Sequence, residues 1–389
     1  MVIDTKSNFG VKISKQGIEE RFNDGAVTYV QNLLGEYLSE QIRCSLDTDW
    51  LDLFNRVVIK DSTKFDVPEE LQEKLPGFGG SASKAGCCIQ YEFDIKGGQV
   101  NDINITPANR PDSRDAAETT ALVREGDLTI RDLGYFRLKY FKTIEEDGAY
   151  FLSRLNTNTL VYQKTDDKYV ELDFGKLYQT MKASHLLISD IQVYIGKEEK
   201  FPVRLIIELC PEEVFNKRIR KVNAYNKKKG HKTSENCKNR AKLSLYITNI
   251  PADKIEGGVI SKIYKIRWQI ELTFKTWKST FNLAKVKKMK YERLMCLLNI
   301  RLLLIMINWE LFSMERAIQF KKTGNLLSAA KCFNTLKDNI EKLRRPLLNN
   351  CKGLRKWIRW MKSAFESSHW LESKKNKMGL EEILYLKIL

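Results

Sequence analysis

The stretch Tyr264-Lys-Ile-Arg-Trp-Gln-Ile-Glu-Leu-Thr-Phe-Lys-Thr-Trp-Lys278 lies inside a helical pattern that runs from about Val259 to Phe281. At about 100° per residue, its apolar side chains fall in one stripe about 80° wide, which is typical of a buried helix face. That stripe consists of Ile263, Ile266, Ile270, Phe274, Trp277 and Phe281. Directly beside it, a second stripe about 60° wide carries Tyr264, Arg267, Glu271 and Lys278. One carboxylate is therefore flanked by two cations and a phenol at the edge of a core.

Two interpretations of the polar stripe compete. It is either a solvated face with an Arg267–Glu271 pair at i,i+4, worth a few tenths of a kcal/mol, or a functional constellation. The preceding sequence favours the second interpretation, because an apolar strand pattern over Leu243 to Ile250 closes with Pro251 directly before this helix.

The spacing Tyr-x2-Arg-x3-Glu-x6-Lys, preceded by Ile247-Thr-Asn-Ile-Pro251, resembles the signature of the IS-four group of bacterial insertion-sequence transposases. These enzymes have a catalytic core with two aspartates and one glutamate. The resemblance implies that Glu271 is catalytic and that Tyr264, Arg267 and Lys278 hold DNA phosphates near it. The rest of the chain must then supply two aspartates.

The first candidate aspartate ends the apolar run Arg56-Val-Val-Ile-Lys-Asp61, which predicts a carboxylate at a strand end. Alternatively, Asp61 starts a turn or caps a helix. The loop Leu75-Pro-Gly-Phe-Gly-Gly80 and the strand pattern from Cys87 to Ile95 also resemble the family's sequence after its first catalytic aspartate. Asp94, on this next strand, is the reserve candidate.

The glycines of the same loop do not indicate a nucleotide site. A P-loop ends in Gly-Lys-Ser/Thr and leads into a helix. Here that ending is missing, and a strand pattern follows.

The second candidate aspartate ends the short strand Leu128-Thr-Ile-Arg-Asp132 and precedes Leu133-Gly134-Tyr135. This arrangement resembles the family's second catalytic aspartate. The alternative is an aspartate that only fixes the turn at Gly134.

The order of the expected elements from residue 56 to residue 155 is β-β-β-α-β-α-β, with carboxylates at the ends of the first and fourth strands. This is the plan of the ribonuclease-H-like α/β fold. The 139 residues from Asp132 to Glu271 are too many for one loop and must include an inserted unit. Four strands are expected there, at Leu160–Gln163, Tyr169–Phe174, Leu186–Ile195 and Val203–Leu209, and the family has a β-rich insertion at this point.

We therefore expect five parts. They are an N-terminal helical region (1–50), the first part of the catalytic core (51–156), the β-rich insertion with a basic segment (157–242), the second part of the core with Glu271 (243–312) and a basic helical region (313–389). Relatives often carry a longer N-terminal DNA-binding region, so we expect a reduced or truncated one here. For the C-terminal region, contacts to DNA and contacts between two chains both fit.

Charge divides the 389 residues unevenly. The net charge is +17, with −8 over residues 1–150 and +25 over residues 151–389, which suits a polyanionic partner. The segment 216–242 is strongly basic and includes Lys227, Lys228 and Lys229. It is either a contact to the DNA backbone, which needs charge more than geometry, or a solvated helix and loop.

Cysteine and histidine usage argues against zinc, because the eight cysteines form no CxxC pair and there are three histidines. Scattered cysteines without a signal peptide indicate a reducing cytoplasm, and we expect a bacterial, nucleoid-associated protein. The apolar run Leu294 to Phe312 is interrupted by polar and charged residues, including Arg301 and Glu310. It predicts a buried helix and not a membrane span.

Three carboxylates, Asp61, Asp132 and Glu271, suit a pair of Mg²⁺ or Mn²⁺ ions. With these carboxylates in place, the resemblance implies a cut-and-paste DNA transposase that acts as a dimer on the inverted repeats of its element and on target DNA. Two alternatives stay open. One is a transposase-derived DNA-binding protein without catalysis, and the other is a stand-alone metal-dependent nuclease.

Overall fold

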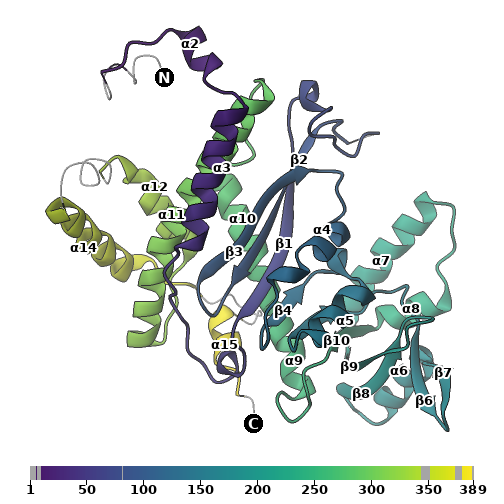
Figure 1. Ribbon diagram of the computed structural model, residues 1–389. Helices are drawn as coiled ribbons and strands as arrows, with labels where there is room; N and C mark the ends of the chain where they lie inside the picture. The colour runs from purple at the N-terminus through teal and green to yellow at the C-terminus, as the bar shows by residue number, and fades with distance from the viewer. Residues whose placement is uncertain (1–5, 7–9, 81, 343–350, 373–378, 388–389) are drawn as a thin grey trace. The chain divides into compact units, whose positions relative to one another are not determined.

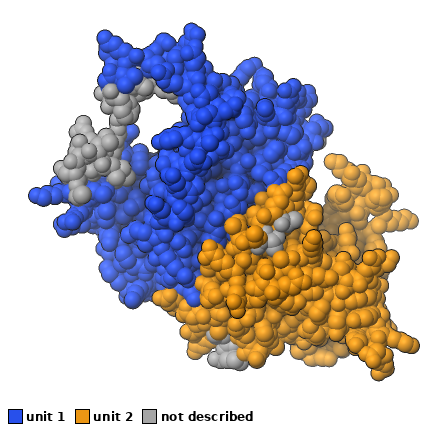
Figure 2. All heavy atoms as spheres, viewed as in Figure 1, with its two compact units in different colours: residues 1–46, 61–110, 269–377 blue, residues 47–60, 111–268, 378–389 orange. Residues whose placement is uncertain are grey.

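The computed structural model describes residues 6, 10–80, 82–342, 351–372 and 379–387. They form a mixed α/β structure with a large sheet and helices (Figure 1). The chain groups into two compact units, each assembled from segments far apart in sequence (Figure 2). Unit 1 comprises residues 1–46, 61–110 and 269–377, and unit 2 comprises residues 47–60, 111–268 and 378–389. The five-part division expected from the sequence remains a prediction.

The predicted order β-β-β-α-β-α-β is confirmed. It consists of β1 (Val57–Asp66), β2 (Gly86–Asp94), β3 (Gln99–Pro107), α4 (Asp112–Glu118), β4 (Leu128–Arg131), α5 (Leu138–Glu146) and β5 (Tyr150–Arg154). In unit 1, β2 pairs with β3 in an antiparallel hairpin, and every residue of β2 is buried. In unit 2, the first half of β1 pairs in parallel with β4, which pairs in parallel with β5.

The strand β1 is longer than expected. The sequence predicted an end at Asp61, because the apolar run stops there, whereas the strand continues to Asp66. In the sheet β1 also neighbours β2, and backbone pairing of this kind keeps a polar stretch extended. Asp61 therefore lies inside the strand, which corrects the expected strand-end position.

The sheet of unit 2 continues through the segment expected to be β-rich. β10 (Leu243–Thr248) lies between β5 and β9 (Phe201–Leu209), followed in order by β8 (Ile188–Ile195), β6 (Val161–Thr165) and β7 (Lys168–Glu171). The expected strand over residues 169–174 ends at Glu171, and α6 (Phe174–Ala183), which the sequence did not predict, follows. The Asp173 carboxylate explains this helix start, since it accepts hydrogen bonds from the backbone N–H groups of Gly175 and Lys176.

Helices dominate the rest of unit 1. The longest, α11 (Tyr291–Thr323), packs against α3 (Asp24–Ser39) and α12 (Ala329–Asp338) (Figure 1). By length and composition alone α11 could cross a membrane, but 56% of its most apolar window is buried inside the protein. Its Trp309 indole donates to the Gly98 carbonyl at 3.1 Å. The prediction of a buried helix at this position is confirmed.

The helical pattern from Val259 to Phe281 is divided. α9 (Gly257–Ile263) leads into a 3₁₀ turn, η5 (Tyr264–Arg267), and then into α10 (Trp268–Thr280). The predicted apolar stripe is buried from Ile263 to Trp277, and its last member, Phe281, is half-buried. The chain passes from unit 2 to unit 1 between Trp268 and Gln269, so Arg267 belongs to unit 2 and Glu271 to unit 1.

Candidate active site

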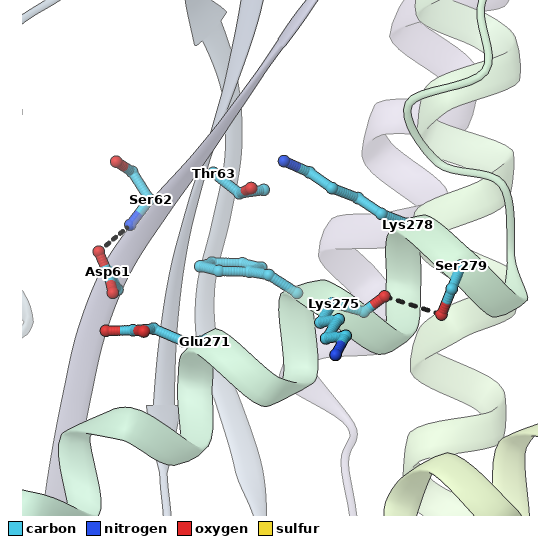
Figure 3. A pocket seen from close by; sticks show the side chains of 8 residues that line it. Asp61, Ser62, Thr63, Glu271, Lys275, Lys278 and Ser279 are labelled. Atoms are coloured by element: carbon cyan, nitrogen blue, oxygen red, sulfur yellow. Dashed lines mark hydrogen bonds between the residues drawn. The ribbon is translucent and has the colours of Figure 1, made fainter.

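In unit 1, the structure brings two of the predicted carboxylates together. Asp61 on β1 and Glu271 on α10 line one cavity of about 560 Å³, and their carboxylates point into the same space (Figure 3). The other lining residues are Ser62, Thr63, Phe274, Lys275, Lys278 and Ser279. Asp61 also accepts the backbone N–H of Ser62 at 2.8 Å. All of these residues come from two elements, the strand β1 and the helix α10. Asp61 and Glu271 are 210 positions apart in the sequence.

Lys278 lines the same cavity from the second turn of α10 beyond Glu271. Its ammonium donates to the backbone carbonyl of Lys64 on β1 at 3.0 Å. Burial lowers the pKa of Lys278, because a charged group loses hydration there. Lys278 thus joins α10 to β1 and places a cation at the cavity that the two carboxylates also line.

In unit 2, Asp132 directly follows β4, as the sequence predicted. Its Oδ1 lies 3.8 Å from Nε of Arg267, and 43% of the Asp132 side chain is exposed, against 16% for Arg267. The second predicted aspartate is therefore open to solvent and beside one predicted DNA-contacting residue.

Tyr264, expected to reach a phosphate, is buried in unit 2. Its hydroxyl donates to the Arg131 carbonyl at 3.5 Å, and its ring lies 5.3 Å from that of Tyr246. Burial raises the pKa of Tyr264 well above its usual value, so the phenol stays protonated.

Asp94, the reserve candidate, has a local role in unit 1. It is buried at the end of β2 and accepts the backbone N–H of Lys96 at 3.1 Å in the turn that leads to β3. It does not belong to the residues that line the Asp61–Glu271 cavity.

The basic segment forms two helices, α7 (Glu212–Lys228) and α8 (Glu235–Ala241). Lys227, Lys228 and Lys229 are all exposed at the C-terminal end of α7, where cations interact favourably with the helix dipole. Gly230, at φ +72°, ends the helix.

Asp61 and Glu271 fit a hard divalent cation, because carboxylate oxygens are the donors that Mg²⁺ and Mn²⁺ prefer. Across the residues described by the structure, no group of three or more His, Cys, Asp or Glu side chains forms a metal-sized cluster. Asp132 belongs to unit 2, so its convergence with the other two carboxylates remains a prediction.

Comparison with known proteins decides the family. The family described as "Transposase DDE domain" matches residues 52–308. The chain belongs to this DDE transposase family. Because the chain belongs to this family, we conclude that it catalyses DNA transposition. Enzymes of the family generally use divalent metal ions.

Several relatives are insertion-sequence transposases. The chain is 32% identical to the transposase for insertion sequence element IS231E of Bacillus thuringiensis subsp. finitimus, over 88% of this chain and 74% of the relative. It is 30% identical to the transposase for insertion sequence element IS1151 of Clostridium perfringens, over 86% and 74%. A cryo-EM structure of a piggyBac transposase synaptic complex with hairpin DNA aligns with a TM-score of 0.41 at 10% identity, over 84% of this chain and 60% of that one.

Sequence reasoning missed four polar residues of the cavity, namely Ser62, Thr63, Lys275 and Ser279. Alternation along an extended strand could have placed Thr63 on the same face of β1 as Asp61. It was not applied because the strand was expected to end at Asp61.

Proposed function

We propose that the DDE transposase cuts DNA at the ends of its insertion element and joins the released 3′-OH to target DNA. The observation that supports this proposal best is the Asp61–Glu271 pair at one cavity, with the Lys278 cation beside it. The order of β1 to β5, α4 and α5 supports a ribonuclease-H-like core, with β6 to β9 as an insertion before the helix that carries Glu271.

Asp61, Asp132 and Glu271 would together hold two Mg²⁺ or Mn²⁺ ions. When bound, such a metal pair activates an attacking oxygen and stabilises the leaving oxygen of a phosphodiester. Asp61 and Glu271 already face a common space, and Asp132 keeps an exposed carboxylate. Because all of its proposed metal ligands are carboxylate oxygens, the site would bind hard cations.

The cations of the signature neutralise phosphate charge in this proposal. Lys278 lies at the cavity, and Arg267 lies beside Asp132, so each accompanies one of the carboxylates. The burial of Tyr264 favours a supporting role, in which its hydroxyl holds η5 to the end of β4 next to Asp132.

The two reaction steps use different nucleophiles. Water attacks the phosphorus at the element's end, the P–O3′ bond breaks, and a 3′-OH is left. That 3′-OH then attacks a phosphodiester of the target, a new P–O bond forms, and a 3′-OH of the target strand leaves. An element has two ends, so we propose that two copies of the chain act together as a homodimer on the DNA.

The test uses a duplex that carries the inverted repeat from beside the coding gene, with target DNA and Mg²⁺. We expect nicking at the repeat, and joined products, from the wild-type chain. Cutting without preference for the repeat and without joining would indicate a stand-alone nuclease instead. Specific binding without any cutting would indicate a DNA-binding protein that has lost catalysis.

A further inference from the structure

The helix α14 (Cys351–Ser368), in the C-terminal part of unit 1, carries a strongly basic face. Lys352, Arg355, Lys356 and Arg359 are all exposed and fall within one stripe at helical spacing. Within the described part of the chain, none of these four has a carboxylate at ion-pair distance, and the helix itself has no acidic residue before Glu366. The face is therefore a single-sign surface.

The opposite face of α14 is already covered. Trp357, Met361 and Phe365 are buried, and the far end of the helix is fixed to α11 and α12. There, the Gln319 amide donates to the Glu366 carboxylate at 2.6 Å, and His369 lies 2.6 Å from the Thr335 hydroxyl. A basic amphipathic helix that inserts into a lipid surface needs a free apolar face, whereas on α14 the apolar face is buried and Trp360 is the large apolar side chain that stays exposed.

The charges on α14 oppose its own folding. Cations at i,i+3 and i,i+4 destabilise an isolated helix by mutual repulsion, and the four basic residues include four such pairs. Lys342, exposed and 5.4 Å from the Trp360 ring centroid, adds a further cation at this border of the helix. Such a surface is stabilised when a polyanion approaches it.

We infer that the exposed face of α14 binds the phosphate backbone of duplex DNA, as a contact separate from the Asp61–Glu271 cavity and from Lys227–Lys229. This inference rests on the proposed function for its biological setting and on the charge of α14 for its chemistry. A second copy of the same face would repel this one, so the face does not suit a symmetric contact between two chains.

The experiment compares three forms of the full-length chain, all checked for equal thermal unfolding. The test variant carries Lys352→Gln, Arg355→Gln, Lys356→Gln and Arg359→Gln. The control carries Lys139→Gln, Lys168→Gln, Lys176→Gln and Lys182→Gln, which removes the same charge from exposed lysines that are spread over unit 2. The dissociation constant for a generic duplex without the element's end sequence is measured against salt, and the oligomeric state is measured by sedimentation.

We expect the test variant to lose roughly tenfold or more in affinity, with a slope of log affinity against log salt smaller by about 0.9 for each lost phosphate contact. The control should stay close to the wild type. A test variant whose slope and affinity match those of the control would overturn the inference, as would a change from dimer to monomer at an unchanged slope. Because the duplex lacks the element's end, the result does not depend on cleavage, and a failure of the proposed function would be seen separately in the nicking assay.

Discussion

Lys60, the residue before Asp61, forms a buried ion pair. The Lys60 ammonium is 2.7 Å from the Asp115 carboxylate, and both side chains are buried in unit 2. Lys60 also donates to the Thr119 hydroxyl at 3.1 Å. Breaking a buried pair by removing one partner leaves an uncompensated charge, which costs about 3–5 kcal/mol.

We predict that Lys60→Met lowers the free energy of unfolding by about 3–5 kcal/mol. The double variant Lys60→Met with Asp115→Leu should recover most of that loss, since no charge is left buried. Denaturant unfolding of the two variants and the wild type measures this directly. Equal losses in the single and double variants would show that the uncompensated Asp115 charge is not the cause of the loss.

The residues of α10 allow metal binding and DNA binding to be separated. Glu271→Ala should abolish nicking and strand transfer but leave binding of the element's end nearly intact, because a carboxylate repels phosphate. Lys278→Ala should weaken end binding, since it removes a cation from the cavity. A gel-shift titration beside a Mg²⁺-dependent cleavage assay measures both effects.

Lys278→Gln is the matched control for lost packing, because glutamine still reaches toward the Lys64 carbonyl without the charge. It should bind as weakly as Lys278→Ala. If Glu271→Ala cuts at the wild-type rate, Glu271 is not a catalytic metal ligand.

At the scale of elements, the C-terminal end of α7 makes a separate prediction. Changing Lys227, Lys228 and Lys229 to Gln should weaken DNA binding at low salt and reduce the salt dependence by about 0.9 per lost phosphate contact. A matched variant at Lys139, Lys176 and Lys182 changes the net charge equally. A salt slope equal to that of this control would identify the α7 cations as solvated only.

Most elements could be predicted because their patterns are local. β3 and the strands around it alternate or run apolar between turn residues, and Asp166 and Asp167, both with positive φ, are of a residue type that favours turns. The helix α6 also carries a local signal, because Phe174, Leu177, Tyr178 and Met181 recur at helical spacing after the Asp173 cap, and the expectation of a strand up to Phe174 missed it. One feature could not be read locally, since β1 continues as a polar strand beyond Asp61 within the sheet that it shares with β2.

The candidate site shows the same division. The Asp61–Glu271 pair was predicted, since a strand aspartate and a helix glutamate matched a known spacing. The burial of Tyr264 was not, because the stripe to which it belongs is polar, and only tertiary packing against Tyr246 and the Arg131 carbonyl covers it.

At the scale of the whole molecule, the three carboxylates should act as one metal site with oxygens about 4–8 Å apart. If so, Mn²⁺ at about 100 times its dissociation constant should stabilise the wild type by about 2.7 kcal/mol. Each of three single variants should remove most of this stabilisation by Mn²⁺, namely Asp61→Asn, Asp132→Asn and Glu271→Gln. A double variant that combines two of these changes should lose no more stabilisation than a single variant, because either change already disrupts the shared site. Thermal unfolding with and without Mn²⁺ measures it.

Asp94→Asn serves as the control, because Asp94 holds the turn after β2 and should leave the response to Mn²⁺ unchanged. Full stabilisation of the Asp132→Asn variant by Mn²⁺ would exclude Asp132 from the site.

The separation of Asp61 and Glu271 by 210 residues has a consequence for the timing of activity. Ribosomes add about 5–20 residues per second, so Glu271 emerges about 10 to 40 s after Asp61. The basic helix α7 is complete before that, while the cavity still lacks its second wall. A nascent chain could thus hold nearby DNA some seconds before it can cut, which would favour action on the DNA molecule beside which the protein is made.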